Sequence, residues 1–163
     1  FSHLAFSHSL FDEQLKRRNI DVSVGRTNLA LMEQSITDIT QTNFLKVSPD
    51  ETAAKTIELL KKEQQTEAFC VAEDGTYVGK LFLPQLLEVK SNTKASLSVT
   101  STDTTIPANS SMFQAMEIAS GFVGEAMAVV DKKNDIIVGV VTEADIFSVY
   151  FKAQSDVHKV EHG

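Results

Sequence analysis

Apolar and polar positions follow a regular order in the first half of this chain. Apolar residues recur at helical spacing over 53–60, and two short apolar runs follow at 69–72 and 77–82, separated by a polar turn. Helical spacing predicts an amphipathic helix, and paired short runs around a tight turn predict a β-hairpin. A second short helix is expected at 83–89, with Pro84 in its first turn.

The second half repeats this order. We expect a Ser- and Thr-rich lead-in at 96–106, a helix that begins at Ser110 or Ser111, a hairpin of 127–130 with 136–141, and a last helix at 143–151. Pro49 aligns with Pro107 and 66–72 with 124–130, both at an offset of 58, which becomes 60 after the longer second turn. A duplicated unit tolerates an insertion best at a loop tip. Ser48 or Asp50 is expected to cap the first repeat's helix.

The two ends lie outside the repeat. Leu10, Phe11 and Leu15 predict a short amphipathic helix, Gly25 is expected to break that pattern, and periodicity is lost from Lys152 onward. The predicted organisation is a linker segment 1–34, repeat 35–89, linker 90–95, repeat 96–151 and C-terminal tail 152–163.

Composition narrows the class of protein. The chain has 163 residues, 42% apolar and 23% charged, and a net charge of −7, which argues against a nucleic-acid partner. Cys70, the single cysteine, excludes a disulfide framework and is expected to be an inert thiol in a buried strand. The four histidines lack partners at ligand spacing, so no metal site is predicted. No Ser/His/Asp, Cys/His or Walker-type set indicates an enzyme.

The candidate chemistry lies where the last predicted strand meets the last helix, at 139–145. Thr142 and Asp145 stand three positions apart, whereas Phe82 and Gln85 hold the matching positions in the first repeat. A Thr-x-x-Asp spacing approximates a capping box and needs no ligand. The same helix N-terminus favours anions, and its carboxylate can accept hydrogen bonds from paired sugar hydroxyls. Both interpretations remain open from the residues alone.

The duplicated unit and the 139–145 motif resemble a tandem pair of cystathionine β-synthase-type (CBS) domains over Ser35 to Phe151. The resemblance implies an α/β (α+β) fold of two pseudo-symmetric repeats, each with a lead-in strand, a helix, a hairpin and a helix, preceded by a helical linker. It also implies an adenosine ligand such as AMP, ADP or ATP, with no required cofactor, in the cleft between the repeats. The implied site residues are Thr37, Thr42, Thr66, Glu67, Ala68, Thr142 and Asp145.

Two departures from the family pattern bear on that site. Phe82 and Gln85 should prevent the first repeat from holding a ribose. Glu125 stands where nucleotide-binding relatives often carry a basic or neutral residue, and a carboxylate there repels a triphosphate. AMP or an uncharged adenosine compound is therefore as good a candidate as ATP.

The N-terminal residues 9–15, 18–22 and 25–26 resemble the stretch before the CBS pair in prokaryotic CLC-type chloride channels and antiporters. The missing initiator methionine and the basic cluster 16–18 fit a cytoplasmic tail of a cell-membrane protein. This resemblance implies a regulatory module that forms a homodimer and contacts the transmembrane part of its transporter. The alternatives are a purely structural dimerisation module with an empty cleft, a CBS sensor of another transporter, or a free-standing sensor.

Overall fold

The computed structural model describes residues 24–100, 103–122 and 124–162. It contains two three-stranded sheets, with orders β1-β2-β3 and β4-β5-β6. A helix over 24–33 comes first. The first repeat then forms η1 (Ile36–Asp38), β1 (Lys46–Val47), α2 (Ala53–Glu63), β2 (Glu67–Val71), β3 (Tyr77–Phe82) and α3 (Leu83–Glu88). The second forms η2 (Ala95–Leu97), β4 (Thr105–Pro107), α4 (Met112–Ala119), β5 (Ala126–Asp131), β6 (Ile136–Thr142) and α5 (Glu143–His162). The predicted α/β fold with two repeats is confirmed.

The predicted offset of 58 between the repeats is wrong by one residue. Val47 pairs with Cys70 in the first sheet and Ile106 with Val129 in the second, so these strands superpose at 59. A one-residue slip would turn every side chain of a strand to the opposite face. The cores require 59, because Ala68 and Cys70 face the helices of the first repeat as Met127 and Val129 face those of the second.

Hydroxyl side chains begin the first helix of each repeat. Thr52 Oγ1 accepts a hydrogen bond from the Lys55 N–H at 3.3 Å, so Thr52 caps α2, and neither Ser48 nor Asp50 does. Ser111 caps α4 in a full capping box with Gln114, in agreement with the prediction of Ser110 or Ser111. Thr52 and Ser111 are themselves 59 positions apart.

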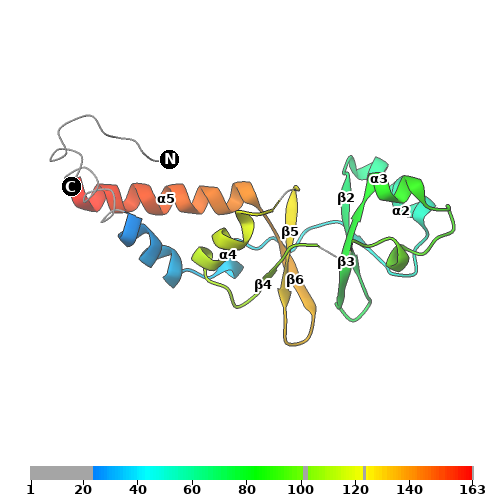
Figure 1. Ribbon diagram of the computed structural model, residues 1–163, viewed down its shortest axis with the longest axis horizontal. Coiled ribbons are helices and arrows are strands. Elements are labelled where there is room, and N and C mark those ends of the chain that lie inside the picture. The colour runs from blue at the N-terminus through cyan, green and yellow to red at the C-terminus, as the bar shows by residue number, and fades with distance from the viewer. Residues whose placement is uncertain (1–23, 101–102, 123, 163) are drawn as a thin grey trace.

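The two ends contain more helix than the sequence predicts. Gly25 is the second residue of a helix over 24–33, and the pattern that it was expected to break lies outside the described residues. The expectation that the last helix ends near Phe151 is wrong, because α5 continues to His162. Figure 1 shows the two helices side by side, so tertiary packing replaces the periodicity missing after Lys152. The amphipathic segment expected around Leu10 lies outside the described residues.

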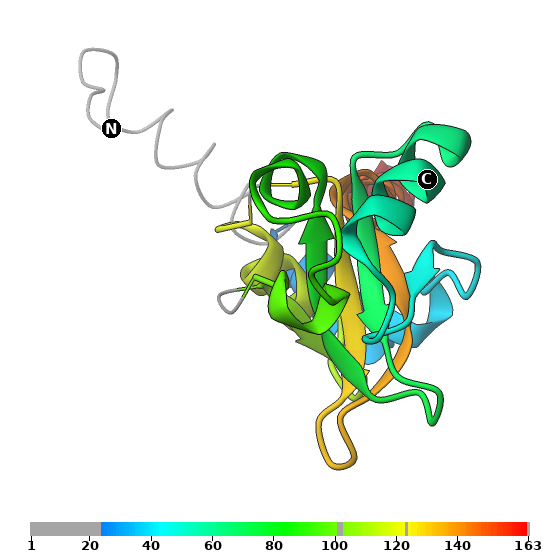
Figure 2. The ribbon, with the colours of Figure 1, turned by 90° about the vertical axis from the view of Figure 1, so that its right-hand side faces the viewer.

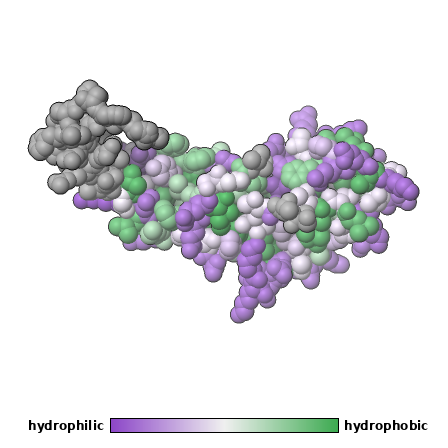
Figure 3. Space-filling view, viewed as in Figure 1, coloured by the Kyte–Doolittle hydropathy of each residue, from purple (hydrophilic) through white to green (hydrophobic). Residues whose placement is uncertain are grey.

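The molecule is built in four layers, helices–sheet–sheet–helices (Figure 1). Viewed along the long axis, one sheet lies in front of the other (Figure 2). A cluster that includes Phe69, Ala128 and Val140 fills the space between the sheets. The tip of the β5–β6 hairpin projects away from this core as a hydrophilic protrusion (Figure 3), and its residues 132–135 are exposed.

The repeats exchange their lead-in segments. Leu31 and Ile36, which precede the first repeat's strands, are buried in the core of the second repeat with Met127 and Ile146. In the same way Ala95, which lies on the lead-in to the second repeat, is buried in the core of the first repeat. Backbone hydrogen bonds hold each segment there, including Met112 N to Gln34 O at 2.7 Å. Each half therefore completes its core with the lead-in of the other half.

Each exchanged segment crosses the other repeat at a glycine. A Cβ atom on Gly139 would lie 2.4 Å from the Gln41 carbonyl oxygen and 2.5 Å from Thr40 Cγ2, and one on Gly79 would lie 2.8 Å from Val99 Cβ. Distances below 3.0 Å cannot be accommodated without movement of a neighbour. The glycine in each strand-to-helix motif is therefore required by the backbone that crosses it.

We expect Gly139→Ala to lower the free energy of unfolding by about 1–3 kcal/mol, the range for forced overpacking. Gly25→Ala is the matched control, since nothing lies within 4 Å of its added Cβ and alanine favours a helix. Urea unfolding of both variants checks this. Equal stability of Gly139→Ala and the unmodified protein would contradict the crossing as described.

Burial in the first sheet raises the pKa of the Cys70 thiol from 9.0 to about 11. Between pH 9.0 and about 11, the Cys70 thiol therefore keeps its proton in the folded chain and releases it in the unfolded chain. The free energy of unfolding should therefore fall as pH rises above about 9, by up to about 1.4 kcal/mol per pH unit from this group. Urea unfolding at pH 8, 9, 10 and 11 should show a smaller decline for Cys70→Ala, and identical declines would disprove the assignment to Cys70.

Candidate functional site

The junction between β6 and α5 forms a reciprocal pair of hydrogen bonds. The Asp145 N–H donates to Thr142 Oγ1 at 3.1 Å, and the Thr142 N–H donates to Asp145 Oδ2 at 3.2 Å. This geometry is a capping box, so the capping interaction predicted from the Thr-x-x-Asp spacing is confirmed. Asp145 is only half-buried, so its carboxylate also remains within reach of solvent.

The lead-in of the first repeat reaches this junction through Gln41. Its Nε2 donates to Asp145 Oδ2 at 2.8 Å, and its backbone exchanges hydrogen bonds of 2.8 and 2.9 Å with Val140. Gln41 was not predicted from the sequence, which pointed instead to Thr37 and Thr42 on either side of it. The first repeat has a matching contact, in which Thr100, 59 positions after Gln41, donates from its Oγ1 to Gln85 Oε1 at 3.0 Å.

A cavity of about 410 Å³ lies between the repeats next to this junction. Phe44 and Phe69 form an aromatic wall with ring centroids 5.5 Å apart, and Val140 closes the side nearest Gln41. The remaining lining residues are Asn43, Leu45, Glu63, Gln65, Glu67, Glu125 and Ala126. Its volume falls within the range of about 300–1,000 Å³ that is typical of small-molecule sites.

The structure brings only some of the predicted site residues to the cavity. Glu67 lines it, whereas the Ala68 side chain points into the core of the first repeat. The exposed Thr37, Thr42 and Thr66 are not among its lining residues. Thr142 and Asp145 are not lining residues either, and they connect to the cavity through Gln41 and Val140.

A buried ion pair stands behind the cavity wall. Lys80 Nζ lies 2.8 Å from Glu67 Oε1, with the two side chains 0% and 8% exposed, and it donates to the Ala126 carbonyl oxygen. Glu67 Oε2 accepts from the Glu125 N–H at 3.0 Å. Since a buried charge is costly unless it is paired and hydrogen-bonded, these contacts are what permit a lysine at this depth.

Three phenyl rings complete the surroundings of the Lys80 ammonium. The centroids of Phe69, Phe82 and Phe122 lie 5.4, 5.5 and 5.0 Å from Nζ, within the range of cation–π attraction. The sequence analysis missed Lys80. A lysine inside the apolar strand 77–82, at the position that Val140 holds in the second repeat, was the available signal.

The matching positions of the first repeat carry polar groups that bond to one another within the chain. Lys80 takes the place of Val140, and Asp103 takes the place of Phe44. The Tyr77 hydroxyl donates to the Asp103 carboxylate. Burial raises the pKa of both groups, so both resist ionisation more than they would in water. The two clefts therefore differ in chemistry, with aromatic and aliphatic walls in one and an internal polar network in the other.

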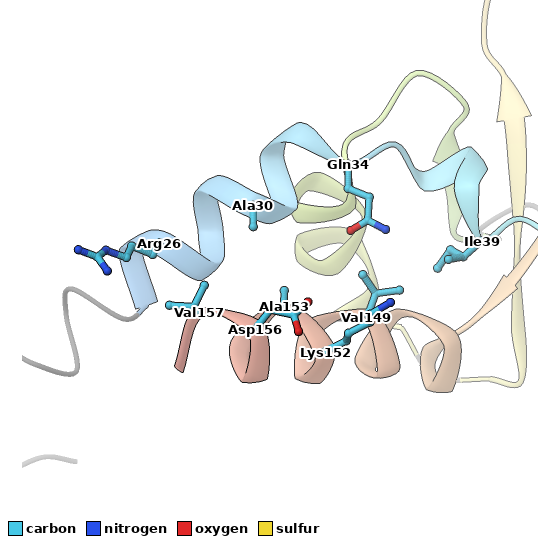
Figure 4. Close-up of a pocket in the computed structure, with 9 residues that line it drawn as sticks. All are labelled: Arg26, Ala30, Gln34, Ile39, Val149, Lys152, Ala153, Asp156 and Val157. Atoms are coloured by element: carbon cyan, nitrogen blue, oxygen red, sulfur yellow. The ribbon is translucent and has the colours of Figure 1, made fainter. Parts of the chain in front are cut away.

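A second hollow lies between the helix over 24–33 and α5 (Figure 4). Its volume is about 550 Å³, and short apolar side chains such as Ala30, Val149 and Ala153 line it. Among the described residues, no group of His, Cys, Asp and Glu is arranged to hold a metal ion. No helix in the described ranges is long and apolar enough to cross a membrane.

Comparison with known proteins supports the architecture derived above. The sequence model of the CBS domain matches residues 36–88 and 96–152, which together make up more than half of the chain. A search among curated proteins found no match. The two matched ranges coincide with the two repeats seen in the structure.

Three solved structures illustrate the shared fold. The CBS pair domain of a protein described as a Mg²⁺ transporter of Shewanella oneidensis MR-1 has a TM-score of 0.65 at 17% identity, covering 78% of each chain. CbpB in complex with c-di-AMP has a TM-score of 0.70 at 12% identity, over 85% of this chain and 98% of that chain. CBSX2 in complex with AMP has a TM-score of 0.61 at 16% identity, over 73% and 97%. The chain therefore belongs to the CBS domain family and carries two copies of that domain.

Proposed function

We propose that this chain is a non-catalytic regulatory module that binds an adenosine ligand in the second cleft and acts on a membrane transporter. The observation that carries the proposal is the asymmetry of the clefts. Next to the junction of Thr142 and Asp145 there is a cavity with an aromatic wall, whereas the matching positions of the first repeat carry the buried Lys80 and the polar Asp103. The ligand would be AMP, ADP, ATP or adenosine itself.

The contacts at the junction suggest how such a ligand would bind. A purine ring can stack against Phe44 or Phe69, and the amides of Asn43 and Gln65 can meet its polar edge. A ribose would reach Asp145 by displacing the Gln41 amide, which now donates to that carboxylate. Solved relatives described as complexes with AMP and with c-di-AMP support an adenine-containing ligand.

Attachment to a transporter is supported from two directions. Among similar structures, one is described as a domain of a Mg²⁺ transporter and another as the soluble part of a magnesium transporter. The resemblance of residues 9–26 to the CLC-type stretch before a CBS pair favours a chloride channel or antiporter as the host. In this arrangement the module lies on the cytoplasmic side, and the helix over 24–33 leads toward the membrane part.

The exposed apolar residues on the helices support a homodimer. Leu87 on α3 and Phe147 on α5 are 60 positions apart and are 63% and 46% exposed, and Phe151 on α5 is 61% exposed. Equivalent apolar positions on two pseudo-symmetric helices suit an isologous contact with a second copy.

A structural dimerisation module with an empty cleft is the second candidate function. The hydrogen bond between Gln41 and Asp145 favours it, because the carboxylate that would hold a ribose already has two donors within the chain. Under this alternative, the junction only fastens the lead-in of one repeat to the other.

The variants Asp145→Asn and Thr142→Ala distinguish these functions. If Asp145 accepts ribose hydroxyls, Asn should weaken AMP binding by about 1.5–3 kcal/mol and lower stability by about 1 kcal/mol or less. Thr142→Ala should do the reverse, with the larger loss in stability and the smaller loss in affinity. Calorimetric titration with AMP and thermal melting of both variants measure the two effects.

The same titration gives the stoichiometry. One AMP per chain is expected, because the first repeat has Phe82 and Gln85 where the second has Thr142 and Asp145. Two equivalent sites per chain, or AMP affinity unaffected by Asp145→Asn, would refute the proposed site. No binding at millimolar AMP, ATP and adenosine would favour the structural module.

For the homodimer, sedimentation velocity of the natural sequence should show a dimer, and Phe147→Asp should shift it toward monomer. Desolvating a carboxylate in an apolar contact costs several kcal/mol. Leu97→Asp is the control, since Leu97 is 77% exposed on η2, outside α3 and α5. A monomer at high concentration for the natural sequence would contradict the proposal.

A further inference from the structure

The carboxylates around the second cleft select for a particular class of ligand. Three of the ten residues that line the cavity are glutamates, Glu63, Glu67 and Glu125. Among the described residues that line it, none is lysine, arginine or histidine. Resting on the function proposed above, we propose that this cleft binds the adenosine group as a nucleoside without phosphates and discriminates against nucleotides.

The glutamates differ in depth. Glu67 is 8% exposed and its charge is balanced by Lys80 at 2.8 Å, so it forms part of the inner wall. Glu63 is the last residue of α2 and Glu125 directly precedes β5. Both are exposed and therefore mark the mouth, one from each repeat. A phosphate that projects through this mouth would lie near carboxylates from both repeats.

Two lysines contact the aromatic rings of the cavity, and neither is one of its lining residues. Lys80 is fully buried and held by Glu67 and the Ala126 carbonyl oxygen. Lys46 lies with its ammonium 5.1 Å from the Phe44 ring centroid and is not a lining residue. The walls themselves suit an uncharged planar group, because the aromatic rings offer stacking and the amides of Asn43 and Gln65 offer neutral hydrogen bonds.

Repulsion at the mouth should order the ligands by charge. Near a protein surface, one carboxylate close to a phosphate changes affinity by roughly tenfold, so we expect adenosine to bind at least about tenfold more tightly than AMP, and AMP more tightly than ATP. Added salt should narrow these differences, since the Debye length falls from about 30 Å at 0.01 M to about 8 Å at physiological ionic strength.

Calorimetric titration of the full chain with adenosine, AMP and ATP, at low and physiological salt, tests the order. The variant Glu63→Gln/Glu125→Gln should raise the ratio of AMP affinity to adenosine affinity by roughly tenfold or more. Glu73→Gln is the control for a single charge removed. Glu73 lies at the tip of the β2–β3 hairpin, six residues beyond Glu67 and thus roughly 20 Å away along the strand direction. Its substitution should therefore leave the ratio of AMP affinity to adenosine affinity unchanged.

The outcomes separate this inference from the function on which it rests. AMP or ATP binding at least as tightly as adenosine would overturn the selection and leave an adenosine site standing. If Glu63→Gln/Glu125→Gln left the ratio of AMP affinity to adenosine affinity unchanged, or if Glu73→Gln raised that ratio equally, the discrimination could not be assigned to the glutamates at the mouth. No binding of any of the three ligands would instead overturn the proposed function.

Discussion

The crossing of a lead-in segment over a glycine is the constraint on which this structure depends. At Gly139 there is no room for a Cβ atom, because the Gln41 carbonyl oxygen would lie 2.4 Å from it. The crossing lets the Gln41 backbone pair with that of Val140. This pairing brings the Gln41 side-chain amide to the Asp145 carboxylate, and Val140 itself forms one side of the cavity. The shared core, the junction and the cavity thus all depend on this close approach of two backbones. The first repeat has the same close approach, between Gly79 and Val99.

The same crossing, repeated in both halves, creates two clefts that the side chains then make different. Where the second repeat has Val140 and the lead-in has Phe44, the first cleft has Lys80 and Asp103. A buried lysine is tolerated there because Glu67, the Ala126 carbonyl and three aromatic rings surround it. Backbone symmetry thus supplies two related clefts, and the polarity of their side chains makes the two differ in chemistry.

The sequence predicted the parts of the structure that depend on local pattern. Helices, hairpins and the Thr142–Asp145 cap follow from periodicity and spacing over a few residues. Gln41 and Lys80 could not be predicted in the same way, because their partners lie 104 and 46 positions away. The offset of 58 failed for a related reason, since aligning Pro49 with Pro107 ignores the alternation of strand faces, which the cores of Ala68 and Met127 fix at 59.

Glu67 connects the two clefts, because its two carboxylate oxygens serve different repeats. Oε1 balances Lys80 of the first repeat, while Oε2 accepts from the Glu125 N–H of the second. Since a buried ion pair is stable only while its partners stay in place, displacement of Lys80 or of the Glu125 N–H would leave the Glu67 carboxylate less well paired. The packing between the two repeats thus depends on a buried charge that residues of both repeats help to balance.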